Sequence, residues 1–194
     1  MSVNFYEQQA DSFAENTLSV DMTALYAEFL PLLAPGSLII DAGCGAGRDS
    51  RYFLSKGFKV IAFDASQALV AIAKQVTGLP VIYSTFLAFN SNSIKADALW
   101  ACASLLHVPW QEQQDTFRHL AKMIKPKGLI YCSYKYGTHD HTKDGRQFTN
   151  ANEIRLEQFI AGSGLRVEKC WLTADARPGR ADEQWLNAIL ENTA

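Results

Sequence analysis

The stretch Ile39–Asp49, IIDAGCGAGRD, decides the fold of this chain. A short apolar run ends at Asp41, three glycines follow at alternate positions, and a helix-type pattern begins at Arg48. Glycine permits a tight turn between a strand and a helix, and it lets a ligand approach the backbone closely. The stretch therefore predicts a buried strand, a ligand-binding turn and a helix whose N-terminus faces the ligand.

Composition limits the class of protein. The chain has 194 residues, of which 48% are hydrophobic and 20% charged, with a net charge of −2. This length predicts a single domain, 1–194, and the near-neutral charge gives no basis for a nucleic-acid or membrane partner. No apolar run reaches the roughly 18 residues that span a bilayer. The cysteines at 44, 102, 132 and 170 form no CxxC pair, which predicts no disulfide, no metal and a cytoplasmic location.

Helix-type and strand-type patterns alternate along the chain. Expected strands are 37–42, 58–64, 80–86, 96–104, 128–135 and 165–174, and expected helices are 21–33, 48–57, 66–78, 110–125 and 153–164. Ser66 is the expected cap of its helix, Gly78 its end, and Pro126 the end of the fourth of these helices. Such alternation predicts a doubly wound α/β fold, with a mostly parallel sheet, helices on both faces and ligands at the carboxyl ends of the strands. The polar segment 136–150 is expected to be a long loop that acts as a lid or contacts substrate.

Two carboxylates limit the classes of ligand that the glycine turn can bind. The glycines Gly43, Gly45 and Gly47 do not match the GxGxxG spacing of dinucleotide-binding turns. Asp41 beside the turn disfavours a pyrophosphate and suits an ammonium or sulfonium group. Asp64 ends the next strand, where such folds bind ribose hydroxyls and where a 2′-phosphate would be repelled. A nicotinamide dinucleotide is therefore disfavoured, although a glycine turn can also be purely structural.

Asp41, the glycines and Asp64 together resemble the class I S-adenosylmethionine-dependent methyltransferases. VIAFDAS (60–66), YSTF (83–86), ADALWACASLLHV (96–108) and MIKPKGLIYCSY (123–134) resemble the later motifs of that class, with Lys127 where many members have glycine. The small methyltransferases grouped with tellurite-resistance proteins are the most similar. The resemblance implies a Rossmann-like, seven-stranded sheet whose last strand, about Trp185–Leu190, is antiparallel. It also implies that residues 1–33 form a helical cap over the cofactor S-adenosylmethionine, which becomes S-adenosylhomocysteine.

The cofactor contacts are expected in the cap, the glycine turn and the ends of the following strands. They are Tyr6, Asp41, Gly43, Cys44, Gly45, Gly47, Arg48, Asp64, Ala65, Ser66, Thr85, Phe86, Ala103 and Ser104. Many relatives carry an acid at the end of the third strand. Here Ser84 and Thr85 stand there, so backbone N–H groups and stacking by Phe86 are expected to recognise adenine. Arg48 has a competing interpretation as a solvent-exposed salt bridge.

Other residues are candidates for the acceptor side. His107 follows the fourth strand and is either a catalytic base or a group that packs and bonds a loop carbonyl. Basic and aromatic residues after the fifth and sixth strands predict binding of an anionic substrate. These are Lys135, Tyr136, Arg146, Arg177, Arg180 and Trp185. His139 and His141 around Asp140 are expected to lie in a solvated loop rather than to bind a metal.

The sequence thus predicts methyl transfer from S-adenosylmethionine to a small-molecule acceptor, an anionic one included. The protein chiefly has to align the acceptor with the methyl group and exclude water. The NPPY-like signature of nucleic-acid and glutamine N-methylation is absent, since CASLLH stands at that place. The alternative is a non-catalytic S-adenosylmethionine-binding sensor or regulatory protein. A monomer or a homodimer is expected.

Overall fold

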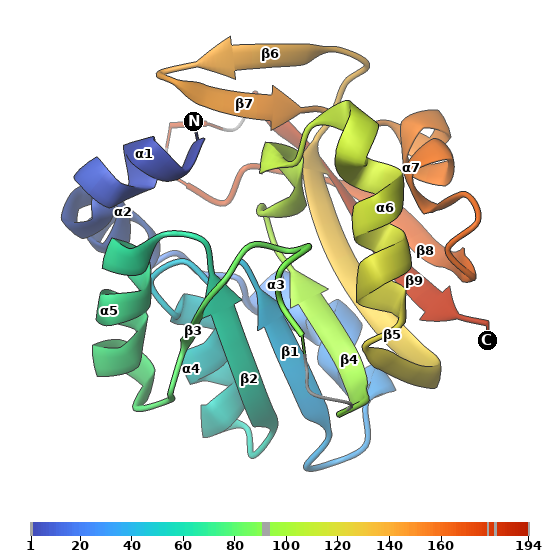
Figure 1. Cartoon of the computed structure of the whole chain (residues 1–194), viewed down its shortest axis with the longest axis horizontal. Helices are drawn as coiled ribbons and strands as arrows, with labels where there is room; N and C mark the ends of the chain where they lie inside the picture. The colour runs from blue at the N-terminus through green and yellow to red at the C-terminus, as the bar shows by residue number, and fades with distance from the viewer. Residues whose placement is uncertain (1, 91–93, 178, 181, 194) are drawn as a thin grey trace.

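The computed structural model describes residues 2–90, 94–177, 179–180 and 182–193. Its main sheet has the strand order β3-β2-β1-β4-β5-β9-β8 (Figure 1). The strands are β1 (Leu38–Ala42), β2 (Lys59–Asp64), β3 (Ile82–Tyr83), β4 (Ala96–Ala101), β5 (Ile124–Lys135), β8 (Leu165–Ala174) and β9 (Gln184–Asn192). Neighbouring strands are parallel except at β9, which is antiparallel to both β5 and β8. The predicted doubly wound, Rossmann-like sheet of seven strands with an antiparallel last strand is confirmed.

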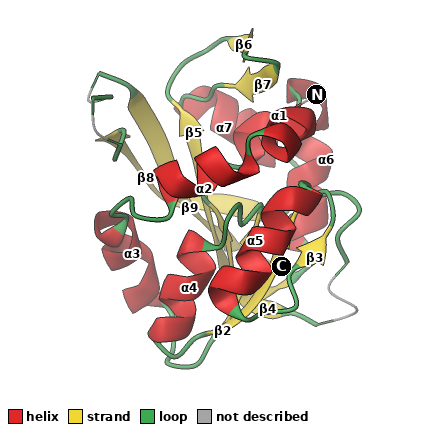
Figure 2. Ribbon diagram, turned by 90° about the vertical axis from the view of Figure 1, so that its left-hand side faces the viewer, coloured by secondary structure: helices red, strands yellow, loops and turns green. Residues whose placement is uncertain are grey.

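Helices cover both faces of the sheet (Figure 2). One face is covered by α3 (Thr23–Phe29), α4 (Arg48–Ser55) and α5 (Gln67–Thr77), and the other face by α6 (Trp110–Ala121) and α7 (Glu153–Ile160). Helix α3 continues directly into the short 3-10 helix η1 (Leu30–Leu32). Trp100 of β4 stacks on Tyr131 of β5 at 3.8 Å between ring centroids, under α3 and α4. The side chain of Ser66 accepts a hydrogen bond from Leu69 N–H, and Gly78 ends α5 with a φ of 73°. Both predicted ends of this helix are therefore confirmed.

The N-terminal helices lie at the carboxyl ends of the strands. They are α1 (Ser2–Gln8) and α2 (Ala10–Thr17), and both contact α5, while α1 also contacts β7 (Figure 1). The Glu7 carboxylate accepts hydrogen bonds from the backbone N–H groups of Gln67 and Ala68 at the start of α5. This places a negative charge at the positive end of the helix dipole. In contrast, α3 packs on the sheet itself through Tyr26 and Phe29.

Three sequence-based expectations about elements are wrong. Residues 140–149 are not a loop but a hairpin of β6 (Asp140–Lys143) and β7 (Arg146–Thr149). Its two-residue turn, Asp144 and Gly145, has φ values of 52° and 70°, as a type I′ turn requires. The third strand is only two residues long. Finally, α6 ends at Ala121 and β5 includes Pro126, which lies where the register with β4 is irregular and a missing N–H is tolerated.

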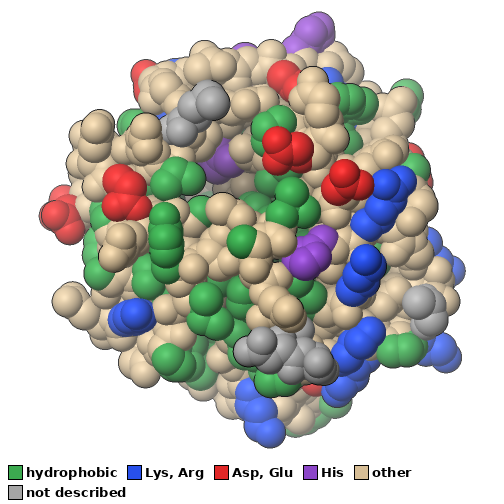
Figure 3. All heavy atoms as spheres, in the orientation of Figure 1, with side chains coloured by type: hydrophobic (Ala, Val, Ile, Leu, Met, Phe, Trp, Pro, Cys, Tyr) green, Lys and Arg blue, Asp and Glu red, His purple; other side chains and the backbone are tan. Residues whose placement is uncertain are grey.

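The surface is mixed in character. On the face shown in Figure 3, Lys and Arg side chains form a row along the right-hand side, and hydrophobic side chains gather at the left and centre. In the described part of the chain, no helix has the length and apolar character needed to cross a membrane.

Candidate functional site

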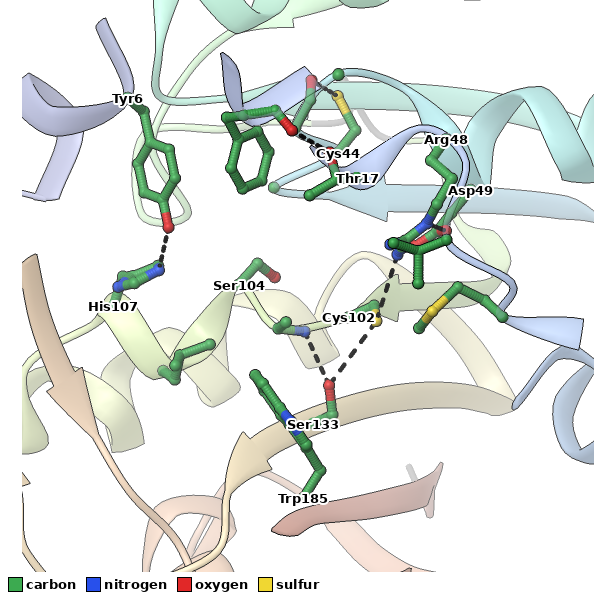
Figure 4. A pocket seen from close by; sticks show the side chains of 18 of the residues that line it. Tyr6, Thr17, Cys44, Arg48, Asp49, Cys102, Ser104, His107, Ser133 and Trp185 are labelled. Carbon is green, nitrogen blue, oxygen red and sulfur yellow. Dashed lines mark hydrogen bonds and ion pairs between the residues drawn. The ribbon is translucent and has the colours of Figure 1, made fainter. Parts of the chain in front are cut away.

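A cavity of about 390 Å³ opens at the carboxyl ends of the central strands, in the size range of ligand pockets (Figure 4). Its walls come from the sheet, from α1 and α2, from the β6–β7 hairpin and from the segment before β9. Of the predicted site residues, those that line the cavity are Tyr6, Gly43, Cys44, Gly45, Arg48, Asp64, Ala65, Ser66, Phe86, Ala103, Ser104, His107, Lys135, Arg146, Arg177, Arg180 and Trp185. Asp41, Gly47, Thr85 and Tyr136 lie outside its lining.

The glycine turn is packed tightly against the loop that follows β4. Gly43 has a φ of 73°, and a Cβ built on it would lie 2.6 Å from the Cβ of Ser104. The Ser104 hydroxyl donates to the carbonyl oxygen of Ala42 at 2.8 Å, and the N–H groups of Gly43 and Cys44 donate to the Phe63 carbonyl at 2.9 and 3.0 Å. The backbone of the turn therefore forms part of the cavity wall, and a side chain at Gly43 would collide with the adjacent Ser104.

Asp64 joins the glycine turn to the start of α5. Its carboxylate accepts hydrogen bonds from Gly45 N–H at 2.8 Å and from Ser66 N–H at 2.9 Å. Burial raises the pKa of Asp64, and these backbone N–H groups oppose the rise. Phe86 packs edge-to-face on Phe63, with 5.7 Å between ring centroids. An acidic and an aromatic group thus lie together at the end of β2.

A second carboxylate, which the sequence analysis did not select, lines the cavity beside the turn. Asp49 accepts hydrogen bonds from Arg48 at 2.6 and 3.0 Å (Figure 4). It also accepts from the Tyr26 hydroxyl at 2.6 Å and from Trp100 Nε1 at 2.8 Å. Burial opposes ionisation of Asp49, but the Arg48 charge and these donors hold its pKa below the usual range. Arg48 is only 21% exposed in its side chain, so its salt bridge is partly buried and lies at the cavity.

Asp41 lies beneath this layer. It is 2% exposed, and it accepts a hydrogen bond from the Ser50 hydroxyl at 2.5 Å. Burial and the neighbouring charge of Asp49 raise the pKa of Asp41. Asp41 is therefore a buried support beneath the turn, while Asp49 belongs to the wall of the cavity.

Beyond the loop after β4, in η2 (Leu105–His107), His107 connects three elements. Its Nδ1 lies 2.8 Å from the carbonyl oxygen of Gln147 in β7, and its Nε2 lies 2.8 Å from the hydroxyl of Tyr6 in α1. A carbonyl only accepts, so Nδ1 carries the proton and the neutral ring accepts from Tyr6 at Nε2. Burial lowers the pKa of His107 to about 4, so the ring is neutral near pH 7.

The cations at the outer end of the cavity differ in how they are paired. Arg177 donates to Asp175 through Nε at 2.9 Å and Nη2 at 2.5 Å. Lys135 lies 2.6 Å from Glu183, and the half-exposed Arg180 lies 3.6 Å from the same carboxylate. Arg146 lies 3.3 Å from the exposed Asp144. The outer half is therefore rich in basic groups, most of them held by carboxylates of the same segment.

One further residue supports the loop after β4. Ala103, at the cavity, has a φ of 50°, which non-glycine residues rarely adopt, and its N–H donates to the Ser133 hydroxyl at 2.8 Å. Ser133 also lines the cavity (Figure 4). The sequence carries no local signal for this contact, because the two residues are brought together only by the pairing of β4 with β5.

Comparison with known proteins shows similarity to methyltransferases over part of the chain. Residues 39–128 match a family model described as a methyltransferase domain. The chain is 33% identical over 94 residues to a malonyl-[acyl-carrier protein] O-methyltransferase of Enterobacter lignolyticus, across 47% of this chain and 36% of that protein. It is 27% identical over 159 residues to a ubiquinone biosynthesis O-methyltransferase of Coxiella burnetii, across 68% and 64% of the two proteins. The chain thus spans less than two thirds of either relative.

Solved structures show the same fold. A 1,6-didemethyltoxoflavin-N1-methyltransferase of Burkholderia thailandensis, with bound 1,6-didemethyltoxoflavin and S-adenosylhomocysteine, has a TM-score of 0.79 at 16% identity over 99% of this chain and 85% of that chain. A TehB-like S-adenosylmethionine-dependent methyltransferase of Corynebacterium glutamicum has a TM-score of 0.73 at 15% identity, over 98% and 97% of the two chains. This chain therefore shares the fold of these solved methyltransferases.

Proposed function

We propose that the protein transfers the methyl group of S-adenosylmethionine to a small, negatively charged acceptor. The observation that carries this proposal is the division of the cavity into two halves. The inner half is built from the glycine turn, Asp64 and the Arg48–Asp49 pair. The outer half is lined by basic side chains from β5, the hairpin and the segment before β9. A cavity with this polarity suits a cofactor at one end and an anion at the other.

The inner residues fit the cofactor. The absence of a side chain at Gly43 lets the turn pack against Ser104 and line the cavity with its backbone, and the Asp64 carboxylate has oxygen lone pairs for the two ribose hydroxyls. Arg48 would bind the cofactor's carboxylate, while Asp49 would attract its ammonium and sulfonium charges. When bound, the cofactor supplies a methyl group activated by a sulfonium centre.

The outer residues have to position an acceptor and exclude water. His107 is a poor base, because burial lowers its pKa and both ring nitrogens already have hydrogen-bond partners. Its role is to hold Tyr6 and the hairpin over the cavity. An acceptor atom that binds in its unprotonated form needs no base, and carboxylates and thiolates meet this condition. The chemistry of the cavity therefore supports an acceptor that arrives as an anion.

The two-part test begins with cofactor binding. S-adenosylhomocysteine should raise the melting temperature of the protein, and NAD or NADP at the same concentration should not. The second part incubates the protein with methyl-labelled S-adenosylmethionine and a panel of small carboxylates, thiols and phenols, each beside its neutral analogue. Transfer to anionic members supports the proposal. Stabilisation by NAD alone would overturn the methyltransferase function, and tight cofactor binding without any transfer would point to a sensor.

Three finer statements belong to the same proposal. A grouping with tellurite-resistance methyltransferases is supported by the TehB-like fold likeness, which extends to the fold alone. A cytoplasmic location is supported by cysteines that are free in the structure. Residues 1–33 would cover the bound cofactor, with α1 and α2 at the cavity and α3 on the sheet. Size-exclusion chromatography would decide between a monomer and a homodimer.

A further inference from the structure

Arg146, the first residue of β7, is held between two aromatic rings. Its guanidinium carbon lies 4.1 Å from the ring centroid of Phe5 in α1 and 5.2 Å from that of Phe148 in its own strand. Its side chain is 20% exposed. Contacts of this kind are favourable for a cation and keep its planar group in one orientation. The guanidinium is therefore positioned before any ligand binds.

Arg146 also carries a donor without a partner. Among the described residues, the buried side-chain N and O atoms that lack a hydrogen-bond partner are Thr116 Oγ1, Arg146 Nε, Asn150 Oδ1 and Arg155 Nε. Only Arg146 belongs to the lining of the cavity. A buried donor without a partner costs about 1–3 kcal/mol, and a ligand acceptor would remove that cost. Arg146 therefore has hydrogen-bonding capacity that no described residue of the protein uses at Nε.

Two neighbouring cations, Arg177 and Lys135, are instead held by carboxylates of the protein. Arg177 is held by Asp175 through two of its nitrogens, and Trp185 Nε1 donates to the same carboxylate at 3.1 Å. Lys135 is paired with Glu183. The carboxylate partner of Arg146 is Asp144, which lies at 3.3 Å and is 58% exposed. Exposed ion pairs of that length contribute little, so an incoming anion would replace Asp144 easily.

We infer that Arg146 is the residue that determines acceptor specificity, and that its guanidinium binds a carboxylate group of the acceptor. This inference rests on the proposed function, and it narrows "small and anionic" to one chemical group. The planar fork of Nε and one Nη matches the two oxygens of a carboxylate. One guanidinium balances the single negative charge of a carboxylate.

The test uses benzoate and its neutral isostere benzamide as probes. Both are titrated into the 194-residue chain saturated with S-adenosylhomocysteine, and binding is followed by ligand-observed NMR. We expect benzoate to bind at least about tenfold more tightly than benzamide, or about 1.4 kcal/mol. Arg146→Gln should abolish this preference, and Arg146→Lys, which keeps the charge but loses Nε, should keep only part of it. Benzamide affinity should stay within about twofold in every variant.

Arg180→Gln is the matched control, because it removes the same charge from the mouth of the cavity at a half-exposed, paired side chain. We expect it to change benzoate affinity by less than about threefold. If Arg146→Gln and Arg180→Gln lose equal benzoate affinity, the anion responds only to the overall positive charge of the cavity, and the inference is overturned. It is also overturned if the native protein binds benzoate and benzamide equally well, or binds neither. A separate S-adenosylhomocysteine titration of each ligand-free variant distinguishes the two failures, because only a loss of S-adenosylhomocysteine binding counts against the methyltransferase function.

Discussion

Substitution of Gly43 by alanine tests the geometry of the glycine turn. The new Cβ would lie 2.6 Å from Ser104 Cβ, a distance at which either the glycine turn or the loop that contains Ser104 has to shift. The residue would also adopt a φ of 73°, which costs an L-residue about 1–2 kcal/mol. Forcing a methyl group into a packed site adds about 1–3 kcal/mol. We expect Gly43→Ala to lower the free energy of unfolding by about 2–5 kcal/mol in total.

The chain offers a matched control for the backbone contribution. Gly57 has a φ of 83°, but a Cβ built there meets nothing within 4 Å. Gly57→Ala should therefore lose only the conformational part, about 1–2 kcal/mol. Ser104→Gly combined with Gly43→Ala removes the atom that collides, so the double variant should recover part of the stability lost.

Urea unfolding of the three variants gives the stabilities, and calorimetric titration with S-adenosylhomocysteine gives the affinities. Because the shift occurs in the cavity wall, Gly43→Ala should also weaken cofactor binding at least about tenfold, whereas Gly57→Ala should not. The reasoning is refuted if the two single variants are equally destabilised. It is also refuted if Gly43→Ala binds S-adenosylhomocysteine as tightly as the native protein.

Three further substitutions test the charged and polar groups of the site. Asp64→Asn should weaken S-adenosylhomocysteine binding by about 10–100-fold in calorimetry, because it removes a charged acceptor worth about 1.5–3 kcal/mol; unchanged affinity would contradict the ribose assignment. Trp100→Phe removes the N–H that donates to Asp49 and should lower the unfolding free energy by about 1–3 kcal/mol in urea. For His107, whose pKa falls from 6.5 to about 4 on folding, the unfolded chain binds a proton between these values and the folded chain does not. Stability therefore rises with pH across this window, and the advantage of the native protein over His107→Gln should fall by about 3 kcal/mol from pH 6.5 to pH 4; an NMR titration midpoint near 6.5 would refute the assignment.

The sheet was predictable because its central strands are buried on both faces and form apolar runs. The strand at 165–174 and the helix capped by Ser66 were predicted at the positions where they occur. The hairpin was missed because every residue of β6 is exposed, so no apolar alternation marks it. The dipeptide Asp144-Gly145 was the available signal, since it is typical of two-residue hairpin turns.

The site was predictable only where it is local in sequence. An acid beside the glycine turn was expected, but the sequence could not show which carboxylate faces the cavity. Side chains alternate along β1, and Asp41 shares the face of Ile39, which is buried under α3 and α4. Asp49 reaches the cavity because it lies in the first turn of α4. The Tyr6–His107 contact joins residues 101 positions apart, and no local pattern encodes such a pair.

The two halves of the cavity are held by different kinds of interaction. The inner half rests on backbone hydrogen bonds and on the packed core under β1 and β4. The outer half is closed by a few polar contacts, among them Ser2 Oγ with Gln147 N–H at 3.0 Å, Tyr6 with His107, and Arg146 over Phe5. Each of these polar contacts contributes on the order of 1 kcal/mol, and Phe148, which is 6% exposed, also anchors β7 in the main hydrophobic core. The same residues that would select the acceptor therefore also hold α1 against η2 and the hairpin, so a change in Arg146 or Tyr6 would alter both the proposed specificity and this packing.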